Sequence, residues 1–356
     1  MKKTLSSLLI LLFVTACSKK NKSDPTPVIS AVTVTVTTLA GSGAHGSVNA
    51  TGISASFFAP NGVAVDAAGN VYVADAINNM IRKISPGGVV TTLAGSGARG
   101  SANGTAISAS FSGPSGVALD AAGNVYVADA YNNRIRKISS GGVVTTLAGS
   151  APGFVNGTGT SASFYSPQGI AVDAVGNIYV ADKLNSVIRK ISPGGVVSTF
   201  AGSGAQGSAN GQAALASFSS PDGVAVDAAG NIYVADPGNG LVRKISSGGV
   251  VTTLAGSGTM GSANGKGILA SFYQPTDVAV DAAGNVYVTD MYNNLVRKIS
   301  PEGVVTTLAG SGTVGSANGI GALASFNLPD GLTVDRAGSI YVADRDNCLI
   351  RKIVVQ

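Results

Sequence analysis

The chain has 356 residues, of which 12% are charged and 49 are glycine, and its 23 basic and 18 acidic residues give a formal net charge of +5. So few charges with so much glycine are typical of many short strands joined by tight turns. Only two cysteines are present, which excludes a fold held by several disulfides and requires a hydrophobic core.

The N-terminal segment predicts export. A short basic start precedes an apolar run over residues 8–14, which is too short to span a bilayer. Residues 14–17 (VTAC) then resemble a bacterial lipobox, in which Cys17 becomes the lipidated first residue. We therefore expect a lipoprotein signal peptide over residues 1–16 and lipidation of Cys17. The alternative is an ordinary signal peptide that happens to contain a cysteine.

The segment after Cys17 predicts a tether. Residues 18–27 carry two prolines and no apolar side chain, so we expect the lipidated cysteine and a flexible linker over residues 17–30. Ser18, in place of an acidic residue, resembles an outer-membrane sorting signal, and either the periplasmic or the surface side suits this pattern. Since no other stretch of about 20 apolar residues occurs, we expect membrane contact through the lipid anchor only.

A repeat of 54 residues, once 53, runs through the rest of the chain. It is easiest to follow through one aspartate, which recurs as Asp75, Asp129, Asp182, Asp236, Asp290 and Asp344. A period of about 50 residues with strand-like content is typical of a propeller or a solenoid.

Each copy of the repeat predicts four strands. In the first copy they are expected at residues 63–66, 71–75, 81–84 and 89–94, with turns of glycine, asparagine and proline between them. The first two strands are almost continuously apolar, which indicates that both of their faces are covered.

The two ends of the repeated region predict a closed ring. The sixth copy lacks its fourth strand, whereas residues 36–41 (VTTLAG) supply a spare one before the first copy. Pairing of these ends would remove two exposed sheet edges, and the polar caps of a solenoid are not visible. We therefore expect an all-β domain over residues 31–356. It would be a six-bladed β-propeller of four-stranded blades, closed by the N-terminal strand pairing with the last blade.

The repeat resembles a known family. The pattern P-x-G-V-A-V-D-x-x-G-N-x-Y-V-A-D-x-x-N-x-x-I-R-K-I is similar to NHL repeats. The segment T-L-A-G-S-G, followed at a distance by A-S-F-x-x-P, is similar to the bacterial and teneurin-type versions of them. The resemblance covers residues 32–356 and implies binding of protein, nucleic acid or another ligand, with a few lyases and lactonases on similar propellers. Fold alone does not fix function.

Most charges recur in every copy and are expected to serve the blades. In the first copy Asp75 and Asn78 precede Arg82, and this spacing recurs six times. Asp and Asn side chains organise turns, and an Asp–Arg pair would neutralise partly buried charge. Six Arg-Lys pairs supply 12 of the 23 basic residues, and the loops carry no basic stripe. Nucleic acid is therefore not expected as a partner.

Function is expected where the copies differ. The first and third turns of each blade hardly vary, whereas the second loop and the loop between blades vary strongly, so one face of the ring is a candidate recognition surface. Non-repeated aromatic residues of these loops are predicted ligand contacts, because exposed tyrosines are good interface anchors. They are Phe58, Tyr131, Tyr165, Tyr273 and Tyr292. Packing beneath the long loops is the alternative role.

A second variable set follows the repeated proline, where the innermost strand begins at the channel mouth. Asn61, Ser115 and Gln168 are predicted ligand contacts. Three further copies contribute Asp222, Asp277 and Asp330, whose oxygens suit Ca²⁺ or another hard cation. They could equally receive a cationic ligand group or be solvated. No other cofactor is expected.

The residues do not support catalysis. His45 is the only histidine, and no nucleophile motif with a nearby base is present. The chain is predicted to be a monomeric, lipid-anchored envelope scaffold that presents its variable loop face to a protein or glycan ligand. One alternative is a metal-dependent, lactonase-type hydrolase that uses Asp222, Asp277 and Asp330 with Asn61. The other is a purely structural envelope protein.

Overall fold

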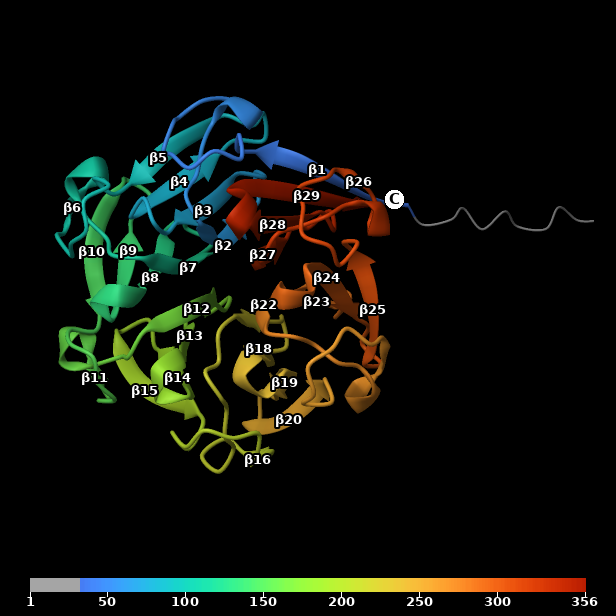
Figure 1. Ribbon diagram of the computed structural model, residues 1–356. Coiled ribbons are helices and arrows are strands. Elements are labelled where there is room, and N and C mark those ends of the chain that lie inside the picture. The colour runs from blue at the N-terminus through green and yellow to red at the C-terminus, as the bar shows by residue number, and fades with distance from the viewer. Residues whose placement is uncertain (1–32) are drawn as a thin grey trace, which may run out of the picture. The chain divides into compact units, whose positions relative to one another are not determined.

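The computed structural model describes residues 33–356 of the chain. These residues form six antiparallel sheets, which Figure 1 shows arranged in a circle. No helix among these residues is long and apolar enough to cross a membrane. The predicted signal peptide, Cys17 and the whole predicted tether over residues 17–30 lie outside the described residues.

Each sheet is one blade, and its four main strands follow the chain from the channel outward. Blade 1 comprises β2 (Pro60–Val65), β3 (Val71–Asp75), β4 (Met80–Ile84) and β5 (Val90–Ala94). Blade 2 comprises β7 (Pro114–Leu119), β8 (Val125–Asp129), β9 (Arg134–Ile138) and β10 (Val143–Ala148). Blade 3 comprises β12 (Pro167–Val172), β13 (Ile178–Asp182), β14 (Val187–Ile191) and β15 (Val196–Ala201).

The other three blades repeat this arrangement. Blade 4 comprises β17 (Val224–Val226), β18 (Ile232–Asp236), β19 (Leu241–Ile245) and β20 (Val250–Ala255). Blade 5 comprises β22 (Pro275–Val280), β23 (Val286–Asp290), β24 (Leu295–Ile299) and β25 (Val304–Ala309). Blade 6 comprises β27 (Pro329–Val334), β28 (Ile340–Asp344), β29 (Leu349–Val355) and, from the other end of the chain, β1 (Val34–Ala40).

Five sheets carry a fifth strand of two residues on their outer edge, which refines the prediction of four-stranded blades. These strands are β6 (Gly104–Thr105), β11 (Gly157–Thr158), β16 (Gly211–Gln212), β21 (Gly265–Lys266) and β26 (Gly319–Ile320). In blade 1 a single bridge between Thr51 and Val89 takes their place.

Ten short 3₁₀ helices lie in the loops of residues 33–356. One set lies in the segments between blades: η1 (Gly52–Ser54), η2 (Ala106–Ser108), η4 (Gly159–Ser161), η7 (Gly267–Leu269) and η9 (Gly321–Leu323). The other set joins the second and third strands: η3 (Ala130–Asn132), η5 (Lys183–Asn185), η6 (Pro237–Asn239), η8 (Met291–Asn293) and η10 (Arg345–Asn347).

The ring closes as predicted. Val36 of β1 pairs with Ile353 of β29 in an antiparallel register, and Figure 1 shows the blue first strand beside the red last one. Packing reinforces this pairing, because Ala40 and Tyr341 from the two ends share a buried cluster with Phe57 of the first copy.

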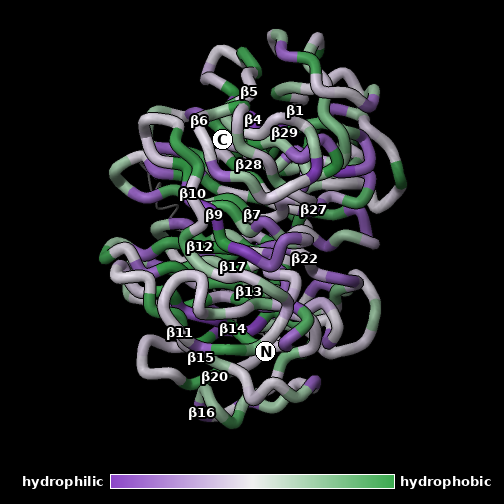
Figure 2. Tube along the Cα trace, turned by 90° about the vertical axis from the view of Figure 1, so that its left-hand side faces the viewer, coloured by the Kyte–Doolittle hydropathy of each residue, from purple (hydrophilic) through white to green (hydrophobic). Residues whose placement is uncertain are grey.

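The hydrophobic core lies between the blades. Each of six buried clusters combines side chains from two adjacent blades, as Tyr72 of blade 1 and Phe111 of the next copy illustrate. The repeated phenylalanines are 0% exposed and fill these interfaces as wedges between the blades. Figure 2 shows hydrophobic segments of this kind running through strands of neighbouring sheets.

The repeated charges form a buried network in every blade. Asp75 Oδ2 accepts hydrogen bonds from Arg82 Nη1 at 2.7 Å and from Asn78 Nδ2 at 2.8 Å. Asp75 Oδ1 accepts from the backbone N–H of Phe58, and Arg82 Nη2 donates to Asn49 Oδ1. Both charged side chains are 0% exposed. Since all six copies have the same ion pair, these charges belong to the blade architecture.

Candidate functional site

The variable loops meet at one mouth of the central channel, where they enclose a cavity of about 290 Å³. All six residues that follow the repeated proline line it: Asn61, Ser115, Gln168, Asp222, Thr276 and Asp330. We call these residues the mouth ring. The prediction placed this slot at the channel mouth, and the ring is complete because every blade contributes one member.

A left-handed residue positions each member of the mouth ring. The residue before the repeated proline has a φ between 49° and 60° in all six blades, which turns the chain from the loop into the innermost strand. In blade 3 this residue is Ser166, and its N–H donates to Asn133 Oδ1 of the preceding blade at 2.8 Å. Non-glycine residues in this conformation are strained. The bond between blades holds the turn that aims Gln168 into the mouth.

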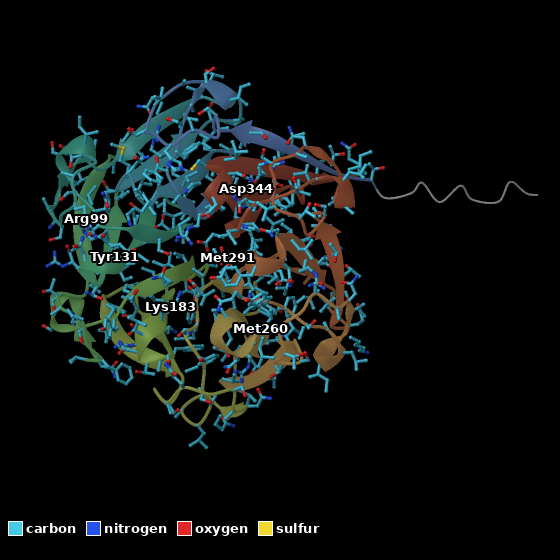
Figure 3. All side chains as sticks on the ribbon, viewed as in Figure 1. Arg99, Tyr131, Lys183, Met260, Met291 and Asp344 are labelled. Carbon is cyan, nitrogen blue, oxygen red and sulfur yellow. The ribbon has the colours of Figure 1, made fainter. Side chains whose placement is uncertain are left out.

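A second set of side chains comes from the loops between the second and third strands. The first two residues after each repeated aspartate lie in the short turns beside the opening. Several of them line the cavity: Ala76, Ile77, Ala130, Tyr131, Lys183, Met291, Tyr292 and Arg345. Figure 3 labels Tyr131, Lys183 and Met291 among these side chains. Lys183, Met291 and Arg345 were not predicted. Their signal is that the two positions after the repeated aspartate change between copies, while the aspartate before them and the asparagine after them recur.

The predicted aromatic contacts divide into two groups. Tyr131 and Tyr292 line the mouth, and Tyr273 packs edge-to-face against Tyr292 with ring centroids 5.0 Å apart. Phe58 instead stacks on His45, with centroids 4.2 Å apart. Tyr165 is exposed, and neither it nor Phe58 lines the cavity. The residues directly after the repeated phenylalanines, namely Phe58, Tyr165 and Tyr273, therefore do not form one common surface at the mouth.

Neutral polar groups occupy one side of the mouth. Ser115 Oγ donates to Gln168 Oε1 at 2.6 Å, and Gln168 Nε2 donates to Ser166 Oγ at 3.0 Å. The side chain of Asn61 makes no hydrogen bond to any residue in the range 33–356. This side can therefore offer an amide with free donors and acceptors to a polar ligand.

Charged groups occupy the other side. Lys183 Nζ of blade 3 donates to Asp222 Oδ2 of blade 4 at 2.7 Å, and the Asp222 carboxylate raises the pKa of Lys183. Arg345 Nη1 lies 3.6 Å from Asp330 Oδ2, beyond hydrogen-bond distance. Burial, reinforced by the nearby Asp222 carboxylate, raises the pKa of Asp330 to about 6.

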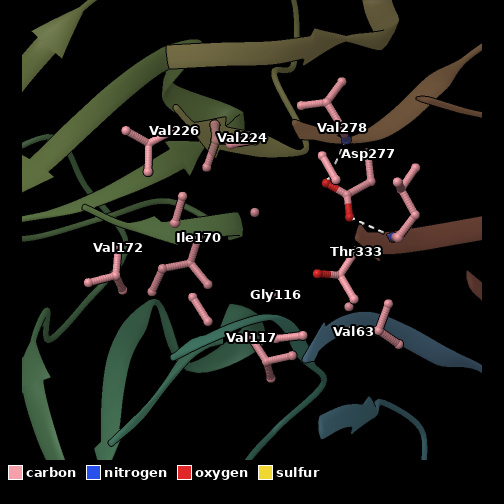
Figure 4. A pocket seen from close by; sticks show the side chains of 18 of the residues that line it. Val63, Gly116, Val117, Ile170, Val172, Val224, Val226, Asp277, Val278 and Thr333 are labelled. Atoms are coloured by element: carbon pink, nitrogen blue, oxygen red, sulfur yellow. Dashed lines mark hydrogen bonds between the residues drawn. The ribbon is translucent and has the colours of Figure 1, made fainter. Parts of the chain in front are cut away.

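The residue after each mouth-ring member lines a narrow space below the mouth, which we call the neck. One blade departs from the repeat there. Five blades have a glycine there, and a Cβ on Gly62 would lie 2.5 Å from the carbonyl oxygen of Ser115 in the next blade. Blade 5 has Asp277, whose carboxylate accepts hydrogen bonds from the N–H groups of Val278 at 2.8 Å and Leu332 at 2.9 Å (Figure 4). Burial raises the pKa of Asp277 well above its ordinary value.

A second substitution accompanies Asp277. Thr289 replaces the alanine that the other blades have at this position of their second strand. Its hydroxyl accepts from the N–H of Asp277 at 3.0 Å and donates to the carbonyl oxygen of Asp330. Asp277 and Thr289 thus provide hydrogen-bond partners for backbone groups at the position where the other blades have a glycine.

The side chains that line the channel below the neck are almost all apolar. A cavity of about 230 Å³ is walled mainly by valine, isoleucine and leucine from the innermost strands, and Asp277 and Thr333 carry the only polar side chains of its described lining (Figure 4). Between it and the mouth lies a space of about 20 Å³, which is close to the room that one water needs. Most polar side chains of the described opening therefore lie at the mouth.

The three predicted metal ligands do not converge on one point. Asp222 is paired with Lys183, Asp330 faces Arg345, and Asp277 binds backbone N–H groups at the neck. Within the part of the chain that the structure describes, no three His, Cys, Asp or Glu side chains are grouped to hold a metal ion. The Ca²⁺ site, and the lactonase-type mechanism that needs it, gain no support from this arrangement.

Known protein families match much of the ring. The NHL repeat family matches residues 111–138, 218–245, 272–299 and 326–353. The teneurin NHL domain matches residues 153–211. These segments lie in blades 2 to 6 and cover strands and loops that the repeat pattern assigns to the same unit.

Individual proteins show the same relationship. The chain is 30% identical over 290 residues to SUPPRESSOR OF QUENCHING 1 of Arabidopsis thaliana, covering 74% of this chain and 27% of that protein. It is 30% identical over 334 residues to NHL repeat-containing protein 2 of Gallus gallus, covering 82% of this chain and 46% of that protein. The chain thus spans less than half the length of these relatives.

A solved structure has the same fold. An auxiliary nutrient binding protein of Bacteroides thetaiotaomicron superimposes with a TM-score of 0.68 at 16% identity, over 90% of this chain and 76% of that one. The repeat pattern, the closed ring of six sheets and the family matches agree. The chain is a six-bladed β-propeller with NHL repeats in blades 2, 4, 5 and 6.

Proposed function

We propose that this chain is a glycan-binding scaffold of the bacterial envelope, and that its binding site is the channel mouth. One observation carries the proposal: six blades with nearly the same frame contribute six mouth-ring residues of mostly different chemistry to one cavity. Structural requirements that are common to all blades do not explain such variation, whereas the recognition of an asymmetric ligand does.

The lining suits a sugar. Tyr131 and Tyr292 offer aromatic faces at the rim, while Asn61, Ser115 and Gln168 offer hydroxyl and amide groups to ligand hydroxyls. At about 290 Å³ the cavity is at the small end of ligand pockets, so it suits a terminal sugar residue more than a long chain.

The cellular setting follows from the N-terminal sequence. A lipid on Cys17 and the tether over residues 17–30 would hold a monomeric ring beside the outer membrane, on its periplasmic or surface side. The likeness in fold to a nutrient binding protein of Bacteroides thetaiotaomicron agrees with a role in capturing nutrient glycans, although that likeness concerns the fold alone.

An oligosaccharide array probed with the full-length chain in detergent tests the proposal. We expect the wild type to retain a defined set of glycans and Tyr131→Ala to lose roughly tenfold in affinity. Tyr165→Ala is the matched control, because Tyr165 is also exposed but lies outside the cavity. Binding of no oligosaccharide, or equal binding by the two variants, would contradict the proposal.

A further inference from the structure

Asp330 differs from the other buried aspartates in lacking a hydrogen-bond donor. It is 7% exposed and lines both the mouth and the neck. No group in residues 33–356 donates a hydrogen bond to its carboxylate, and its one ion-pair partner, Arg345 Nη1, is 3.6 Å away. By contrast Asp75 receives three donors and Asp277 receives two.

A buried carboxylate without donors is costly, so its surroundings should supply a partner in the working state. The cavity beside Asp330 is open to a ligand, and no nearby donor lies within hydrogen-bond distance of its carboxylate. Lys183 binds Asp222, while Arg345, which is 39% exposed along its side chain, lies 3.6 Å from Asp330 and 4.0 Å from Asp346. A ligand in the cavity can therefore supply a donor to Asp330 in place of water.

The charges around Asp330 favour a cationic donor. Its neighbours from blades 3 to 6 are the two cations Lys183 and Arg345 and the three carboxyl groups Asp222, Asp277 and Asp346. Because burial raises the pKa of Asp277 well above its ordinary value, its charge is left out of the balance; Asp222, Asp330 and Asp346 then outnumber the two cations by three to two. A ligand ammonium group beside Asp330 would reduce this imbalance and donate the absent hydrogen bond.

We propose that Asp330 is the specificity residue of the mouth, and that it receives the free ammonium group of an amino sugar. This inference rests on the proposed glycan-binding function and names its ligand class. The neutral side of the mouth, with Asn61, Ser115 and Gln168, then faces the sugar hydroxyls. N-acetylation of the sugar removes the charge, so acetylated ligands should bind more weakly.

The inference predicts a pH dependence. Because the pKa of Asp330 is raised to about 6, the carboxylate is ionised above that pH and protonated below it. Amino-sugar binding should therefore weaken as pH falls from 7 to 5, and it should also weaken above pH 7 as the sugar amine loses its proton. The three other carboxyl groups and the two cations named above share the field at this site. A variant of Asp330 is consequently needed to assign the effect.

Calorimetry with the full-length chain in detergent tests the inference. The probes are fully N-acetylated chitotriose and its fully deacetylated counterpart, each at pH 7 and pH 5, because near pH 7 the Asp330 carboxylate is ionised while much of the sugar amine is still protonated. For the wild type at pH 7 we expect the deacetylated probe to bind at least about tenfold tighter than the acetylated one, as one charge-assisted hydrogen bond would produce. Asp330→Asn should abolish this preference and its pH dependence.

Two further variants separate ligand binding from structural effects. Asp346→Asn removes the same charge from an exposed neighbour and should retain the preference for the deacetylated probe. Arg345→Gln removes the cation that competes for Asp330 and should tighten binding of the deacetylated probe. A variant that only damaged the fold would not change affinity in this favourable direction, and thermal melting confirms that each variant is folded.

The outcomes distinguish this inference from the proposed function. If both probes bind wild type equally, or Asp330→Asn keeps the preference, the inference is wrong while glycan binding stands. If neither probe binds but other array glycans bind through Tyr131, the inference is also overturned and the proposed function again survives. If no oligosaccharide binds at all, both are overturned.

Discussion

Two kinds of buried aspartate occur in this ring, and their surroundings are opposite. Asp75, like its five counterparts between the blades, is fully buried with an arginine, an asparagine and a backbone N–H as donors. Asp330 at the mouth is nearly as buried and has no donor within hydrogen-bond distance. Charges that recur in every copy are satisfied internally and hold the blades together, whereas a charge found in few copies is left facing a cavity.

The largest expected effect comes from breaking one repeated network. Arg82→Leu should lower the free energy of unfolding by about 3–5 kcal/mol, because it leaves the Asp75 carboxylate buried with one donor fewer and no counter-charge. Urea denaturation measures this loss.

Lys83→Met is the matched control for that variant. Lys83 lies beside Arg82 on β4, and its ammonium group lies 5.4 Å from the Tyr72 ring at a partly exposed position. Its substitution should change stability by less than about 1 kcal/mol. Equal losses for both variants would mean that the buried network adds nothing beyond ordinary packing.

The second prediction concerns Asp330, whose substitution should raise the free energy of unfolding where Arg82→Leu lowers it. Since the folded pKa of Asp330, about 6, is above its value in the unfolded chain, the folded state holds the proton more tightly. Ionisation of Asp330 therefore removes stability as pH rises from about 4 through 6. Asp330→Asn should raise the free energy of unfolding by up to about 3 kcal/mol at pH 8 and by little at pH 4.

Denaturation of wild type and Asp330→Asn across this pH range measures the gain. Asp222→Asn serves for comparison, because it removes a carboxylate that Lys183 already neutralises. That variant should give no gain at pH 8. A stability gain from Asp330→Asn that is the same at both pH values would contradict the assignment of the effect to ionisation.

A smaller effect is expected at the neck, where blade 5 departs from the repeat. Thr289→Ala should cost about 1–2 kcal/mol, because it removes the hydroxyl bonded to Asp277 and Asp330. The cost should shrink when Asp277→Gly restores the glycine of the other blades. A double-mutant cycle measures this coupling. Strict additivity would show that the two substitutions are independent of each other.

The repeat pattern predicted the fold and its closure because every copy has the same order of apolar strands and turn residues. Apolar strands such as Val71–Asp75 and the spare strand at the N-terminus leave few other ways to cover both faces of each sheet. The two-residue outer strands were missed, since segments such as Gly104–Thr105 have no apolar pattern that distinguishes them from loop.

Part of the mouth was also predictable, because one slot per copy repeats around a ring. Asp277 was grouped with Asp222 and Asp330, although it follows Thr276 along the same strand, and successive strand residues point to opposite faces. Thr276 therefore takes the mouth-ring place, while Asp277 lines the neck and channel. Lys183 was missed because its partner Asp222 lies 39 residues away in the next blade, a contact that arises only when adjacent blades pack together.

The smallest stability effects are expected for the rim tyrosines. These residues test whether a side chain at the mouth can affect ligand binding without contributing to the stability of the blade framework, which we call the frame. Tyr131 is 64% exposed and Tyr165 is 46% exposed, so Tyr131→Ala and Tyr165→Ala should each change the free energy of unfolding by less than about 0.5 kcal/mol. Their effects on glycan affinity should differ, since only Tyr131 lines the cavity. Thermal melting and calorimetry on the same samples compare the two quantities. A loss of affinity in Tyr131→Ala that merely tracked a loss of stability would assign this tyrosine to the frame, because a residue of the recognition surface should affect binding without affecting folding.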